Sequence, residues 1–188
     1  MLFWRPTGEI KEERLVLHAQ SGDRWALDIL LKRYEIQLFR HVYRIVGDEQ
    51  AAYDVLQETF IVVAKNIAKL RFRDKYKAWI FGTATRIALK GRQKIAVRSA
   101  SETDEDVADH SLRALDLVLE KEKVQQMMAE IHSLSLPLRS VVLLHYIEEF
   151  TLCETAKALE LPVGTVKSRL AAALAALRTR MSAVPEIP

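Results

Sequence analysis

Apolar side chains recur every three or four residues over most of the chain, which is the period of an amphipathic helix. The longest such stripes run from Ala26 to Ile45 and from Ala51 to Ile67. No segment shows a convincing alternation of apolar and polar residues, the pattern of a half-buried strand. The pattern therefore predicts an all-α protein.

Turn and capping residues divide this pattern into separate helices. Ser21-Gly22 and Gly47-Asp48 interrupt it, and Asp23 and Asp48 are suited to cap the helix that follows each break. The helices expected in this part of the chain cover residues 12–21, 23–46, 48–67 and 75–94.

A polar, acidic stretch separates two helical parts. Residues 99–116 carry six acidic side chains and one arginine, and large apolar residues are almost absent before Leu112. Segments of this composition do not bury enough apolar surface to fold. The sequence therefore predicts two small helical domains joined by a flexible acidic linker. The predicted divisions are a disordered tail over 1–11, a first domain over 12–95, a linker over 96–115, a second domain over 116–182 and a C-terminal tail over 183–188.

Composition excludes several classes of protein. With 188 residues, 49% of them hydrophobic and 28% charged, the chain has an ordinary globular make-up. Its apolar runs are far shorter than the ~18 residues that cross a membrane, and its N-terminus lacks the pattern of a secretory signal. These features predict a cytoplasmic protein. The five histidines and the single Cys153 show no metal-ligand spacing, so we expect no metal, no cofactor and no enzymatic activity.

Positive charge is concentrated in one block. The net charge is only +3, yet residues 65–98 contain eleven Lys or Arg and a single acid, Asp74. Phe72 and Trp79 lie among these cations, and cations interleaved with flat rings suit single-stranded nucleic acid. An amphipathic helix with solvated charges and buried rings would have the same composition. For Trp79, a place in the core is the stronger interpretation.

The C-terminal part contains the pattern of a helix-turn-helix. Thr151 and Glu154 form a capping box, Leu161-Pro162 ends the short helix that follows, and a further helix starts at Val163. The start of this last helix offers amides, hydroxyls and cations, which suit the DNA major groove. These groups belong to Gly164, Thr165, Lys167, Ser168 and Arg169. A helical hairpin that serves only as core is the alternative.

Two sets of motifs together resemble the extracytoplasmic-function (ECF, group IV) sigma factors of bacterial RNA polymerase, which belong to the sigma-70 family. The segment from Val163 to Leu170, VGTVKSRL, is similar to region 4 of these proteins. The segments Asp54 to Phe60 (DVLQETF) and Lys77 to Phe81 (KAWIF) are similar to their region 2. Both sets occur in the family's order and spacing, and the resemblance covers about residues 20–95 and 115–182.

The resemblance implies a promoter-reading subunit of RNA polymerase with no small-molecule substrate. It implies that region 2 docks on the β′ clamp of core polymerase, that region 4 contacts the β flap, and that an anti-sigma factor, free or membrane-anchored, holds the protein inactive. The family's core-binding positions correspond to Asp54, Gln57, Glu58 and Ile61, and its positions for the minus-ten element of the promoter DNA to Arg71, Arg73, Lys75, Arg86 and Lys90. The five residues at the start of the last helix would read the minus-thirty-five element.

Two departures from the family pattern leave other functions open. Ile87 follows Arg86 where an Arg-Asn pair is common, and the alanine-rich segment 171–176 stands where the family has several basic residues. A sigma mimic, which binds an anti-sigma factor and never contacts DNA, would tolerate these alanines but has no need of the basic block. A repressor or activator that dimerises on a palindrome would leave the DVLQETF face unexplained.

Overall fold

The structure is a computed structural model that describes residues 10–99 and 122–181. Within these ranges every regular element is a helix, which confirms the predicted all-α class. The first unit comprises α1 (Glu12–Gln20), α2 (Arg24–Val46), α3 (Glu49–Asn66), the short 3-10 turns η1 (Ile67–Lys69) and η2 (Arg73–Lys75), and α4 (Tyr76–Ser99). The second comprises α5 (Glu122–His132), α6 (Leu136–Val142), the π-helix η4 (Leu143–Ile147), α7 (Leu152–Leu159) and α8 (Val163–Met181).

Parts of the predicted organisation lie outside the described residues. They are the first nine residues of the N-terminal tail, most of the acidic linker, the start of the second domain and the C-terminal tail. The helix expected over 75–94 is longer than predicted, since α4 continues to Ser99. Residues 92–99 contain neither glycine nor proline, so nothing in this segment stops the helix at the predicted point.

The helix boundaries follow from the capping residues that the sequence indicates. The Asp23 carboxylate accepts hydrogen bonds from the backbone N–H groups of Trp25 (3.0 Å) and Ala26 (3.3 Å) at the start of α2. Gly47, with φ of 80°, ends α2 in the left-handed conformation that glycine adopts without strain. At the start of α7 both reciprocal bonds of the capping box between Thr151 and Glu154 are present.

We expect Asp23→Ala to lower the free energy of unfolding by about 1 kcal/mol, because two amides at the start of α2 lose their acceptor. Urea denaturation followed by circular dichroism measures this loss. Asp28→Ala is the matched control, since its exposed ion pair with Lys32 (2.9 Å) contributes little. Equal stability of the two variants would contradict the capping role.

Both units contribute to one apolar core. In the first, the buried faces of α2 and α4 meet through side chains such as Leu38, Val42 and Phe81. In the second, α7 packs on α8, with Ala156 and Val166 both buried. The predicted inward stripes therefore correspond to the core, and the two-helix pattern in the second unit is a helix-turn-helix.

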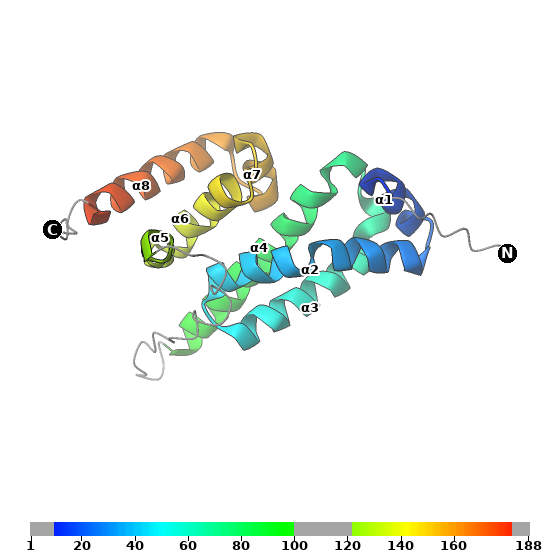
Figure 1. Ribbon diagram of the computed structural model, residues 1–188, viewed down its shortest axis with the longest axis horizontal. Helices are drawn as coiled ribbons and strands as arrows, with labels where there is room; N and C mark the ends of the chain where they lie inside the picture. Colours follow the sequence, from blue (N-terminus) through cyan, green and yellow to red (C-terminus); the bar gives the residue numbers. More distant parts are fainter. Residues whose placement is uncertain (1–9, 100–121, 182–188) are drawn as a thin grey trace.

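The two units pack against each other. Helix α4 contacts α7, and α2 contacts α6, so two helices of the first unit face the second (Figure 1). The sequence predicts two domains on a linker, and nothing in it indicates this contact. No helix among residues 10–99 and 122–181 is both long enough and apolar enough to cross a membrane.

Candidate polymerase and DNA interfaces

The acidic surface predicted for polymerase binding lies on α3. Asp54, Gln57, Glu58 and Ile61 are all exposed, while Val63 and other residues on the opposite side of the helix are buried. The spacing of three, four and seven residues places the four on one helix face. Ile61 is 53% exposed, so this face combines hydrogen-bond acceptors with an uncovered apolar side chain. Such a surface suits a basic protein partner.

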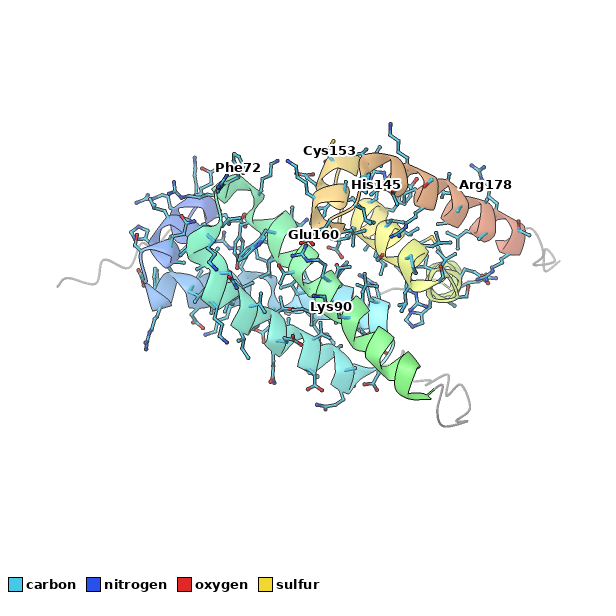
Figure 2. All side chains as sticks on the ribbon, turned by 180° about the vertical axis from the view of Figure 1, so that it is seen from behind. Phe72, Lys90, His145, Cys153, Glu160 and Arg178 are labelled. Atoms are coloured by element: carbon cyan, nitrogen blue, oxygen red, sulfur yellow. The ribbon has the colours of Figure 1, made fainter. Side chains whose placement is uncertain are left out.

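The loop before α4 presents two of the predicted minus-ten residues. Arg71, Phe72 and Arg73 are exposed, and Phe72 is the most exposed large apolar side chain among those described, at 67% (Figure 2). Gln20 of α1 fixes this loop: its Nε2 donates to the Leu70 carbonyl (2.7 Å), and its Oε1 accepts from Arg73 Nε (2.8 Å). Gln20 was not predicted as part of this surface, because it lies far from the loop in the chain.

The aromatic residues of the basic block divide between core and surface. Tyr76 is fully buried, and burial raises the pKa of its phenol well above the usual range. Trp79 is partly buried and packs against the core and against the Tyr76 ring, with 6.1 Å between ring centroids. Phe72 is therefore the ring in this block that stands free for a base, and Trp79 occupies a core-packed position.

The remaining minus-ten candidates lie on α4 or in the turn before it, and they face different surroundings. Lys90 is exposed (Figure 2). Lys75, in the turn before α4, pairs with Glu154 of α7, with 3.0 Å between Nζ and Oε1. This ammonium, together with hydrogen bonds from Thr151, lowers the pKa of the Glu154 carboxyl. Arg86 Nη1 donates to the Ala158 carbonyl (2.5 Å), and its Nε lies 3.4 Å from Glu160 Oε1.

The start of α8 carries the predicted minus-thirty-five residues. Gly164, Lys167 and Ser168 are exposed, whereas Thr165 and Arg169 are half-buried. The Ser168 hydroxyl donates to the Thr165 carbonyl (3.0 Å), which leaves its oxygen lone pairs as acceptors. In the next turn the exposed positions are alanines, including residues 171 and 172. The predicted minus-thirty-five side chains are therefore confined to the first two turns of α8, up to Arg169.

A buried polar cluster that the sequence did not predict lies at the junction of the two units. His41 and Glu148 are both buried, with 3.3 Å between Nδ1 and Oε1, and His41 Nε2 lies 2.8 Å from the Thr85 hydroxyl. Arg139 is also buried and donates to the Ile45 carbonyl of α2 (2.8 Å). The histidine pattern suggested only ordinary helix positions, because these partners come from distant segments and have no local signature.

Comparisons with known proteins agree with this arrangement. Residues 30–98 match Sigma-70 region 2, and residues 124–177 match Sigma-70, region 4. The chain is 27% identical over 184 residues to the ECF RNA polymerase sigma factor SigW of Bacillus subtilis, covering 92% of this chain and 98% of SigW. It is also 27% identical over 173 residues to the RNA polymerase sigma-H factor of Pseudomonas aeruginosa, covering 85% and 88% of the two chains.

Two solved structures share the fold. CnrH, in complex with the cytosolic domain of CnrY, has a TM-score of 0.67 at 21% identity and covers 93% of this chain and 99% of its own. The sigma factor RpoE of Bartonella quintana, in complex with the anti-sigma factor NepR, has a TM-score of 0.66 at 18% identity, covering 86% and 98%.

The two regional matches occur in the order and at the positions of the two structural units, and the relatives align over most of their length. The chain belongs to the sigma-70 family, whose members are transcription initiation factors and not enzymes. Within that family it is an ECF sigma factor, which binds core RNA polymerase and directs it to promoters.

Proposed function

We propose that this chain is a group IV, cytoplasmic sigma factor whose three surfaces have separate tasks. The acidic α3 face docks on the β′ clamp of core polymerase. The loop over residues 70–75 and the outer side of α4 open and read the minus-ten element, and the start of α8 reads the minus-thirty-five element while region 4 contacts the β flap. The observation that carries this proposal is the exposure of Asp54, Gln57, Glu58 and Ile61 together on one face of a firmly packed helix.

A photocrosslinking experiment tests the polymerase surface. A benzoylphenylalanine at Ile61 should crosslink to the β′ subunit when the chain is mixed with core polymerase. The same group at Trp25, which is 43% exposed but lies at the start of α2, is the control and should give no β′ product. Equal crosslinking from both positions, or none from Ile61, would reject the docking surface.

The minus-ten assignment rests on charge and on an available ring. Arg71 and Arg73 are exposed cations on either side of Phe72, an arrangement suited to hold the phosphates of an unpaired strand while a base stacks on the ring. Permanganate footprinting of the polymerase complex tests this function, because it detects unpaired thymines. Phe72→Ala should weaken strand opening at the minus-ten element, whereas Phe72→Trp should retain it.

A specific feature favours the rival function, a sigma mimic: the exposed positions of α8 directly after Arg169, at residues 171, 172 and 175, are alanines. A mimic would bind an anti-sigma factor but give no transcript with core polymerase. The exposed cations of the loop and of the first turn of α8 favour a DNA-reading protein.

We further propose that an anti-sigma factor regulates this chain, as the resemblance implies. The partner captured by the affinity-tagged chain from its own cells should protect both units from trypsin and should inhibit transcription by the reconstituted polymerase. A mixture of the chain with bovine serum albumin is the control for nonspecific protection. A captured protein that leaves transcription unchanged would contradict this regulation.

A further inference from the structure

The contact between the two units involves the same helix that is proposed to read the minus-ten element. Gly82 in the middle of α4 lies directly against α7, and its three nearest atoms outside its own helix backbone all belong to Ala158. A Cβ at this glycine would lie 2.7 Å from the Ala158 Cα and 2.9 Å from its carbonyl oxygen. The two helix backbones can approach this closely only because residue 82 has no side chain. The contact between α4 and α7 therefore depends on this glycine.

Around this close approach, cations of the DNA-reading segment bind acceptors of region 4. Lys75 pairs with Glu154, and Arg86 binds both the Ala158 carbonyl and the Glu160 carboxylate. Figure 2 shows Glu160 where the second unit meets α4. Carboxylate and carbonyl oxygens therefore occupy the positions next to these cations that phosphate oxygens of DNA would need.

The deeper part of the junction combines packed aromatic rings with two cations that donate to backbone carbonyls. The Phe81 ring of α4 packs edge-on against Phe150, with 5.7 Å between centroids. Lys77 Nζ lies over both rings, at 5.8 and 5.4 Å, and donates to the Glu148 carbonyl (3.2 Å). The buried Arg139 also donates across the junction to the Ile45 carbonyl. The junction is therefore a packed interface of defined geometry.

We propose that this packing is a self-inhibited state of the sigma factor, in which α7 and its C-cap Glu160 occupy Lys75 and Arg86, two of the five minus-ten cations, without any partner protein. The proposal rests on the proposed function, because it assigns regulation to that same surface. The α3 face and Lys167 on α8 remain exposed in this state. Core polymerase can therefore engage the closed protein, whereas binding of single-stranded promoter DNA to Lys75 and Arg86 requires that α7 move away.

The variant Gly82→Ala tests the closed state. Its Cβ is incompatible with the position of Ala158, while alanine is the better helix former and does not weaken α4 itself. Gly91→Ala is the matched control, since the same helix carries this glycine with no atom within 4 Å of the added Cβ. Glu160→Lys is a second opening variant, because it sets two like charges together only in the closed state.

Small-angle X-ray scattering of the full-length chain measures the opening. We expect a larger radius of gyration for Gly82→Ala and Glu160→Lys than for the wild type and Gly91→Ala. The affinity for a fluorescein-labelled, random-sequence 12-nucleotide single strand measures the consequence. If about one wild-type molecule in ten is open, Gly82→Ala should bind about tenfold more tightly and Gly91→Ala should match the wild type.

Each outcome bears on a different claim. Identical dimensions of the wild type and both opening variants would overturn the self-inhibited state, and crosslinking from Ile61 to β′ would still stand as support for the proposed function. Opening without a gain in oligonucleotide affinity would overturn inhibition of DNA binding by α7 and would also count against the minus-ten role of Lys75 and Arg86.

Discussion

Replacing both Asp54 and Glu58 with lysine is expected to abolish binding to core RNA polymerase. The two carboxylates lie on one exposed face of α3, and the substitutions would set ammonium groups against the basic partner that this face is proposed to meet. Like charges in an interface cost several kcal/mol, which corresponds to a loss in affinity of more than about a hundredfold. Size-exclusion chromatography with core polymerase measures complex formation directly.

The control for this variant must change the net charge by the same amount. Glu13→Lys combined with Asp28→Lys does so, since these exposed acids lie on α1 and α2. Circular dichroism should show unchanged helical content for both double variants, because all four side chains are exposed. Retained core binding by the α3 variant, or an equal loss in the control, would contradict the assignment of this face.

Removing Lys167 or Arg169 is expected to cost about 1 to 3 kcal/mol of promoter binding for each side chain that contacts a base. This corresponds to roughly a 5- to 150-fold loss in affinity. The effect should be large because the exposed positions of the next turn, at residues 171 and 172, are alanines and cannot compensate. Polymerase containing Lys167→Ala or Arg169→Ala, assayed by filter binding on promoter fragments, measures the change.

The dependence on sequence and salt distinguishes two kinds of contact. Loss of a base contact weakens the sequence preference at one position of the minus-thirty-five element. Loss of a phosphate contact instead weakens binding to all sequences alike and reduces the salt slope by about one unit. Lys32→Ala in α2 removes an equal charge from the first unit and should leave promoter binding unchanged. If both α8 variants bind the promoter as well as the wild type does, region 4 does not read DNA through this turn.

The elements of this fold were predictable because their signals are local. Asp23 and Thr151 lie a few residues from the amides that they cap, and the apolar stripes of α2 and α3 reflect a period that a single helix displays. The acidic face of α3 follows from the same period, since residues three and four apart share a helix side. The exposure of these residues could therefore be predicted without knowledge of the tertiary structure.

The junction between the units was not predictable, because each of its contacts joins distant segments. Gly82 looks like any glycine that weakens a helix until Ala158 is placed against it. His41 pairs with Glu148 from the end of another helix, and neither residue lies in a recognisable motif. Similarly, Lys75 and Arg86 were predicted as DNA contacts from the resemblance and the charge of the segment, and neither distinguishes a phosphate from a carboxylate of the same chain.

The alanine-rich surface of α8 remains the feature that most separates the DNA-reading protein from a sigma mimic. Both would bind an anti-sigma factor, and both would present the acidic α3 face. They differ in whether polymerase that carries the chain starts transcripts at defined sites.

Run-off transcription tests whether this chain directs RNA polymerase to promoters. Core polymerase is assayed with the wild-type chain, with the double lysine variant at Asp54 and Glu58, and without either, on a library of promoter fragments from the source genome. The account predicts discrete transcripts that appear only with the wild-type chain and whose start sites share a minus-ten and a minus-thirty-five element. Stable binding of the wild-type chain to core polymerase with no such transcripts would contradict it.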